Sequence, residues 1–135
     1  MNKLLRYALS LLIPSFLVNL WLMVRYRCVI HPGARILFPT NVQIGRGTMI
    51  GKCTIVGQGP IRICKNCFIN DHTILNAKTG FIEIGDQTSI NHYSVVFGNG
   101  GVEIGRHCAI GLNVQIIKNH LIPPLMSDGY PQTSE

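Results

Sequence analysis

The segment IGDQTSINHYSVV, residues 84–96, carries an aliphatic residue at every sixth position, at Ile84, Ile90 and Val96. The same six-residue spacing recurs before and after this segment. The last aliphatic residue of one triplet precedes the first of the next by seven, nine and eight positions in turn. A six-residue period fits neither an amphipathic helix nor a simple alternating strand, and internal repeats of this kind are typical of solenoids. The other triplets are Ile44, Ile50, Val56; Ile63, Ile69, Leu75; and Ile104, Ile110, Ile116.

The residues around each aliphatic position support the same frame. Two positions earlier the residue is small or β-branched, as at Thr48 and Thr88, and the following residue is often Gly or Asn, as at Gly45, Gly85 and Asn91. We expect these Gly and Asn residues to occupy turns with positive φ. Three short strands would then form one triangular coil of about 20 residues, and coils would stack about 4.8 Å apart.

The repeat therefore predicts an all-β fold, a parallel β-helix over residues 28–120 with the twelve aliphatic residues inside. Ile30 and Ile36 extend it upstream by part of a coil. A β-sandwich is disfavoured because strands of four to eight alternating residues are lacking. Spacing also predicts stacked neighbours: Asn99 lies under Asn119, and a second corner column contains Cys53, His72, Tyr93 and Asn113.

Charge and cysteine content narrow the functional classes. The net charge of +6 is concentrated in residues 1–27, which carry four basic residues and no acid, so the repeat is nearly balanced and gives no reason to expect nucleic acid. The five cysteines form an odd set. Cys64 and Cys67 are the one closely spaced pair and lack a second pair of metal-ligand spacing, which favours structural cysteines in a reduced cytoplasmic setting and no metal.

Two segments, INHYSVV at residues 90–96 and IGRHCAIGLNVQIIKNH at residues 104–120, together with the repeat, resemble the hexapeptide-repeat acyltransferase superfamily. Similarity is greatest to the maltose and galactoside acetyltransferases and to the sugar O-acetyltransferases of capsule and lipopolysaccharide assembly. The resemblance implies a left-handed β-helix, a homotrimer, acetyl-CoA as the acyl donor and a sugar or cell-surface glycan as the acceptor.

The resemblance also implies roles for particular residues. A coil ending in an Asn-His pair and followed by a loop, here residues 121–135, assigns the general base to His120, because imidazole can remove a hydroxyl proton near neutral pH. Asn113 matches a position near the acceptor, and Asn99, Asn119 and Tyr93 are its expected companions in substrate binding. Relatives continue with further coils, so the resemblance implies that this chain is truncated at its C-terminal end and has little activity alone.

Residues 1–27 form a separate N-terminal segment that is expected to be α-helical. Residues 7–24 are an uncharged run of 18, the lower limit for crossing a bilayer, flanked by basic residues. Two interpretations stay open. One is a membrane-attached helix, interfacial or spanning, with its basic flanks on anionic lipid at the inner face of the plasma membrane, which is favoured because sugars for export are modified on lipid carriers at the membrane; the other is a helix that covers the open end of the β-helix.

Two other functions compete with the acetyltransferase. A non-catalytic β-helical scaffold would show the same repeat, because a fold does not determine a function. A zinc-dependent carbonic anhydrase on this fold would need converging histidines with a His-x-x-x-x-His pair, which the sequence lacks.

Overall fold

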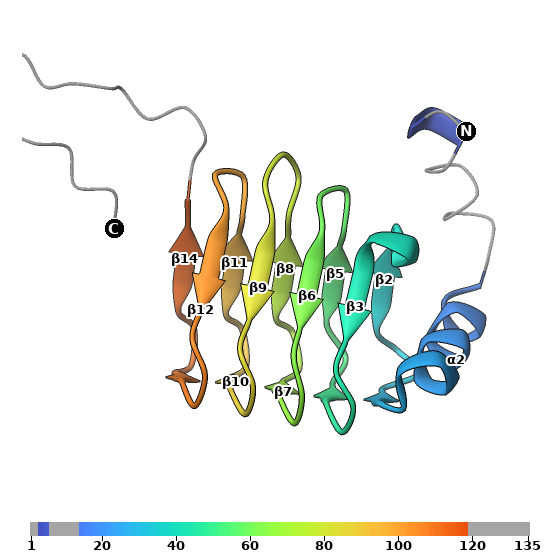
Figure 1. Ribbon diagram of the computed structural model, residues 1–135, viewed down its shortest axis with the longest axis horizontal. Coiled ribbons are helices and arrows are strands. Elements are labelled where there is room, and N and C mark those ends of the chain that lie inside the picture. The colour runs from blue at the N-terminus through green and yellow to red at the C-terminus, as the bar shows by residue number, and fades with distance from the viewer. Residues whose placement is uncertain (1–2, 6–13, 119–135) are drawn as a thin grey trace, which may run out of the picture.

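The structure is a computed structural model that describes residues 3–5 and 14–118. Within them the chain is a parallel β-helix preceded by helix α2, Ser15–Tyr26, and residues 3–5 are also helical. Three parallel sheets form the sides of a triangular prism. Figure 1 shows the coils stacking in sequence order, with the strands of the near face pointing down and those behind pointing up as the chain advances from right to left, which is a left-handed coil.

Each coil contributes one strand to each sheet. Sheet A contains β1 (Val29–Ile30), β4 (Met49–Ile50), β7 (Phe68–Ile69), β10 (Ser89–Ile90) and β13 (Ala109–Ile110). Sheet B contains β2 (Arg35–Leu37), β5 (Thr54–Val56), β8 (Ile74–Asn76), β11 (Val95–Phe97) and β14 (Gln115–Ile117). Sheet C contains β3 (Val42–Ile44), β6 (Ile61–Ile63), β9 (Ile82–Ile84) and β12 (Val102–Ile104), and a short 3-10 helix, η1 (Pro39–Asn41), precedes β3.

The aliphatic columns fill the prism as the repeat predicts, except at Val56, although Ile110 and Ile116 of the last described coil are only partly buried. Ile50 pairs with Ile69, and Ile69 with Ile90, and all three are buried. In β5, however, Ile55 rather than Val56 pairs with the buried Leu75. Val56 was therefore the wrong choice, because the turn between β4 and β5 is one residue shorter than its neighbours.

The same shortened turn corrects the position of Cys53. Cys53 is buried, and its carbonyl accepts from Arg35 N at 2.9 Å while Thr73 O accepts from Thr54 N at 3.0 Å, so Cys53 is equivalent to Thr73. It does not share a corner column with His72 and Tyr93, both of which have positive φ.

Small polar residues connect successive coils through buried hydrogen bonds. Thr88 Oγ1 donates to Gly105 O at 2.6 Å and accepts from Cys108 N at 3.2 Å. Thr48 repeats this arrangement with Cys64 O and Cys67 N, at 2.6 and 3.1 Å. The small residues two positions before the aliphatic residues therefore also serve as hydrogen-bonding residues.

The glycines that follow the aliphatic residues have a different role from the one expected. Gly45 and Gly85 do not have positive φ. A Cβ at Gly45 would collide with the backbone of Cys64 in the next coil, and one at Gly85 would lie 2.7 Å from Arg106 N. Close approach of coils, rather than left-handed backbone, excludes side chains there.

Helix α2 covers the N-terminal end of the prism. Val18, Asn19 and Leu22 are buried, and Asn19 Nδ2 donates to Ala34 O at 2.9 Å and to His31 O at 3.3 Å. The helix ends at a left-handed Arg27, whose N–H bonds Met23 O. In the described part of the chain, no helix has the length and apolar character needed to cross a membrane.

Candidate functional site

The predicted site residues lie at two different corners of the prism. Tyr93 and Asn113 lie where sheet A passes into sheet B, and we call this edge the A–B corner. Asn99 lies where sheet B passes into sheet C, which we call the B–C corner. Asn119 and His120 lie outside the described residues.

One chain does not bring these two groups together. Tyr93 and Asn99 flank the same strand, β11, and six residues of extended chain span up to about 20 Å. The turns of the B–C corner lie at the top of Figure 1, and the A–B corner lies at the opposite end of the sheet B strands. A single sugar could therefore not contact both corners of one chain.

The A–B corner carries a ladder of side chains on left-handed backbone. His72, Tyr93 and Asn113 have φ of 62°, 64° and 54° and occupy equivalent positions in successive coils. Backbone bonds fix the register: Tyr93 N donates to Asp71 O at 3.3 Å and Asn113 N to His92 O at 3.0 Å. The His72 and Tyr93 rings stack with centroids 5.0 Å apart and planes 12° apart. The ladder thus presents an imidazole, a phenol and an amide along one exposed edge.

Asp71 adds a carboxylate beside this ladder. Its Oδ1 accepts from Lys52 N at 2.8 Å, and this hydrogen bond, with nearby His92, His31 and His72, lowers the pKa of Asp71 below its ordinary value. The Asp71 side chain therefore stays ionised in weak acid and offers an anionic acceptor next to three imidazoles.

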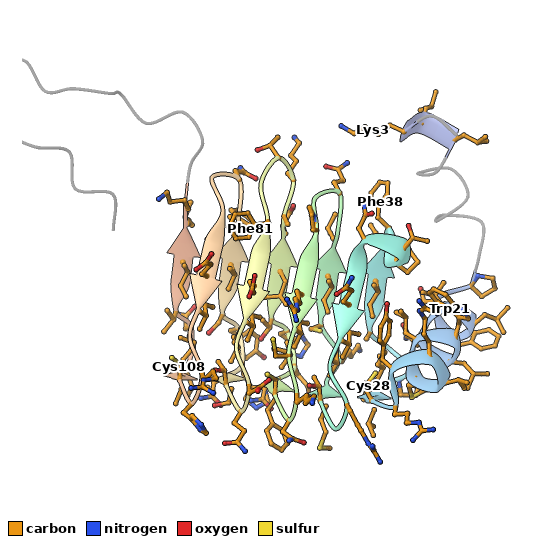
Figure 2. The ribbon with its side chains drawn as sticks, viewed as in Figure 1. Lys3, Trp21, Cys28, Phe38, Phe81 and Cys108 are labelled. Atoms are coloured by element: carbon orange, nitrogen blue, oxygen red, sulfur yellow. The ribbon has the colours of Figure 1, made fainter. Side chains whose placement is uncertain are left out.

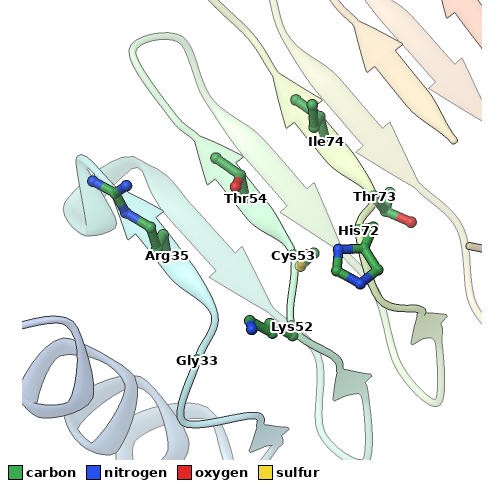
Figure 3. Close-up of a pocket in the computed structure, with 8 residues that line it drawn as sticks. All are labelled: Gly33, Arg35, Lys52, Cys53, Thr54, His72, Thr73 and Ile74. Atoms are coloured by element: carbon green, nitrogen blue, oxygen red, sulfur yellow. The ribbon is translucent and has the colours of Figure 1, made fainter. Parts of the chain in front are cut away.

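The shortened turn at Lys52 leaves a hollow next to the A–B corner. Its volume is about 370 Å³, and Figure 3 shows its lining across β2, β5 and β8. The Lys52 stem lies over Gly33, where a Cβ would approach Lys52 Cγ to 3.2 Å. Its lining residues are Gly33, Arg35, Lys52, Cys53, Thr54, His72, Thr73 and Ile74.

The charged side chains that line this hollow are cationic. Arg35 and Lys52 supply two cations on neighbouring coils, and His72 supplies an imidazole at the edge. Sequence reasoning missed Arg35 and Lys52 because they are 17 positions apart and the frame placed Cys53 in the wrong column. The sequence offers no clear signal for them, because Ile55 and Val56 are both aliphatic and either could continue the buried column.

The cysteines are structural in the described coils. Burial raises the pKa of Cys53 to about 12 and that of Cys28 to about 11. Burial also raises the pKa of Cys67, whose Sγ lies 3.1 Å from Gly85 O, and of Cys64. Raised values keep these thiols protonated and poorly nucleophilic near neutral pH. Across residues 3–5 and 14–118, no group of three His, Cys, Asp or Glu side chains is arranged to hold a metal ion.

In comparisons with known proteins, no family model, no curated protein and no solved structure matches this chain.

Proposed function

We propose that the chain is an acetyl-CoA-dependent O-acetyltransferase that acts on a sugar of a cell-surface glycan, with His120 as general base. The observation that carries the proposal is the register of the last described strand. Lys118 N donates to Phe97 O at 3.0 Å and Gly100 N to Lys118 O at 2.8 Å, so β14 follows β11 to its end. Asn119 and His120 follow Lys118 in the sequence and lie outside the described residues.

The chemistry requires one base and two aligned reactants. His120 would take the proton of a sugar hydroxyl as its oxygen attacks the thioester carbonyl of acetyl-CoA. The new C–O bond replaces the C–S bond, and the coenzyme A thiolate leaves and recovers a proton. A positioned base contributes about 10²–10⁴-fold in such transfers.

The separation of the two corners supports an oligomer as the active form, and the resemblance implies that it is a homotrimer. Asn99 and the ladder of Tyr93 and Asn113 lie at opposite ends of the sheet B strands, so a neighbouring copy would have to supply one of the two groups to a shared acceptor site. We infer that Tyr93 and Asn113 of one copy meet the Asn99 corner of the next.

A non-catalytic assembly subunit is a second candidate, favoured by an apolar strip on sheet A. Val29, Met49 and Phe68 lie in register on three successive strands and remain exposed. Such a flat apolar column is typical of an association surface. It fits a catalytic trimer and a scaffold equally well, so activity has to separate them.

The test is turnover of acetyl-CoA with a panel of sugar acceptors, measured on this chain and on a version extended by further hexapeptide coils. His120→Ala should lower turnover about 10²–10⁴-fold, as expected for loss of a general base. His107→Asn is the matched control, because His107 is an exposed histidine with φ of 56°, which Asn tolerates. Equal turnover by the His120→Ala variant would overturn the assignment, and assembly without turnover in the extended version would favour the scaffold.

A further inference from the structure

Helix α2 is apolar on two opposite faces. The inner face, with Val18 and Leu22, is buried against the first coil. The outer face covers roughly 140° of the helix at about 100° per residue, and every side chain on it is about half exposed or more. Figure 2 shows carbon-rich side chains projecting from α2 beyond the end of the prism, where Trp21 is labelled. The outer face consists of Phe16, Leu17, Leu20, Trp21 and Val24.

The contacts of the inner face fix which side of α2 points outward. Asn19 donates to the carbonyls of His31 and Ala34, so rotation of the helix would break one buried and one partly buried hydrogen bond. Cys28, directly after the helix, is also buried and lies with Sγ 3.8 Å from Leu22 O. The outer apolar face is therefore a permanent feature of this end of the molecule.

Charge is sorted along the axis of the prism. Residues 1–70 contain nine Lys and Arg and no acid, whereas residues 71–135 contain three Lys and Arg and all six acids. Because the coils stack in sequence order, the cationic half is the half that carries α2. The basic residues of the described cationic half are Lys3, Arg25, Arg27, Arg35, Arg46, Lys52, Arg62 and Lys65.

Aromatic and cationic groups meet at the edge of the outer face. The Arg25 guanidinium lies 5.9 Å from the Trp21 ring centroid and 5.4 Å from that of Tyr26. Trp and Tyr beside Arg, with an apolar body and a polar rim, favour the boundary between hydrocarbon and head groups.

We propose that the outer face of α2 docks in the plane of a lipid bilayer whose surface carries anionic phospholipid. The apolar side chains enter the head-group boundary, and the cationic end of the prism faces the negative surface. A helix of 12 residues measures about 18 Å, against about 30 Å of hydrocarbon, which agrees with an in-plane position. Pairing of two copies through this face is disfavoured, because it would bring two cationic ends together.

The single tryptophan makes the test direct. Trp21 is the one tryptophan in the sequence and lies on the proposed docking face. With the full chain and vesicles of phosphatidylcholine and phosphatidylglycerol, we expect a blue shift of Trp21 emission and quenching by brominated lipid. Vesicles of phosphatidylcholine alone should bind at least ten-fold more weakly, and added salt should weaken binding to the anionic vesicles.

Matched variants distinguish docking through the outer face of α2 from nonspecific hydrophobic adsorption to vesicles. The Leu17→Gln, Leu20→Gln double variant should lower vesicle affinity at least ten-fold, whereas Met49→Gln, Phe68→Gln should not. The two pairs are equally exposed, at 47% and 53% against 46% and 49%. Arg25→Glu with Arg27→Glu should likewise weaken binding, whereas the same charge change at Lys78 and Arg106, on distal coils, should not.

Three results would overturn the proposal. The first is Trp21 emission that anionic vesicles leave unchanged. The second is equal binding by the Leu17→Gln, Leu20→Gln variant, which would place any membrane contact elsewhere in the chain. The third is concentration-dependent self-association, lost in that variant, that shields Trp21 without lipid and assigns the face to a second copy. Point variants are preferable to removal of residues 1–27, which would uncover the first coil.

Discussion

At the scale of single residues, the polar groups inside the prism are as specific as the aliphatic ones. Thr88 is fully buried and uses both its donor and its acceptor, joining its own coil to the next. Valine has nearly the same shape but can neither donate nor accept, so a substitution isolates the hydrogen bonds from the packing.

We expect Thr88→Val to lower the free energy of unfolding by about 1–3 kcal/mol, because Gly105 O and Cys108 N lose their side-chain partner. Thr88→Ser, which keeps the hydroxyl, should lose less. Urea denaturation followed by circular dichroism would measure both. Equal stability of Thr88→Val and the parent chain would show that these hydrogen bonds contribute nothing net.

A charge at a buried aliphatic position should destabilise the chain far more than loss of the Thr88 hydroxyl does. Ile90→Asp places a carboxylate at a fully buried position among Ile69 and Ile110 and should cost more than about 4 kcal/mol, enough to unfold the chain. Ser89→Asp, one position earlier on the outward side of β10, is the control and should fold. A folded, soluble Ile90→Asp variant by circular dichroism would refute the assignment of this column to the core.

The buried thiols should make stability depend on alkaline pH. Burial raises the pKa of Cys53 from 9.0 to about 12, so the unfolded chain loses this proton at a lower pH than the folded chain. Both states are protonated below pH 9, and the contribution of Cys53 to stability is therefore complete there and is lost as pH rises from 9 towards 12.

Cys53→Ala should flatten this alkaline decline when denaturation is measured across the pH range. Cys108→Ala is the control, because Cys108 is only partly buried. An unchanged slope in Cys53→Ala would contradict the raised pKa. At neutral pH, alkylating reagents should modify Cys108 well before Cys53.

At the scale of elements, one polar residue, Asn19, adds hydrogen bonds to the apolar packing of α2 against the prism. Asn19 is 1% exposed and donates twice to the first coil, while its Oδ1 has no hydrogen-bond partner among the described residues. An asparagine in the middle of an apolar helix is otherwise unfavourable, so its hydrogen bonds explain why the helix packs with this face inward.

Asn19→Ala should therefore loosen α2 without unfolding the coils. We expect faster amide exchange of Met23 and Leu22 and an earlier phase of unfolding, because His31 O and Ala34 O lose their donor. Hydrogen exchange with mass spectrometry would measure it. Ser15→Ala, at the exposed first residue of α2, serves as the control. Identical amide exchange in the Asn19→Ala and Ser15→Ala variants would rule out the anchoring role of Asn19.

The elements also show what the sequence could and could not predict. The period of six determined the strands and the core, because only one spacing places the repeating aliphatic residues inside. It could not choose between Ile55 and Val56, since both are aliphatic and the choice depends on hydrogen bonds of the neighbouring coil. For the same reason Cys53 was misplaced and the hollow with Arg35 and Lys52 was missed.

The candidate site was less predictable than the fold. Tyr93 and Asn113 were correctly expected in one column with His72, because equal offset in successive coils follows from the repeat. Their distance from Asn99 follows from the path of β11 across the prism, which the repeat also contains. The base assignment of His120 depends on resemblance and remains a prediction, since His120 lies outside the described residues.

At the scale of the whole molecule, the proposed trimer makes a direct prediction. Sedimentation velocity of the chain should show a species three times the mass of the 15.0 kDa monomer. Met49→Lys combined with Phe68→Lys would place charges on the apolar strip of sheet A and should dissociate it if that strip forms the interface. Arg106→Glu is the control. A monomer at all concentrations would contradict the shared site.

The stacking of coils in sequence order gives the molecule a nearly one-dimensional energetics. Each coil bonds only the coil before and the coil after it, so neighbouring interfaces, rather than a central nucleus, set the cooperativity. Unfolding should then begin at an end coil and proceed coil by coil towards the middle, and α2 should oppose its start at the N-terminal end. The amides of β6 to β10 should consequently exchange last, and a weak coil in the middle would divide the chain into two independently melting blocks.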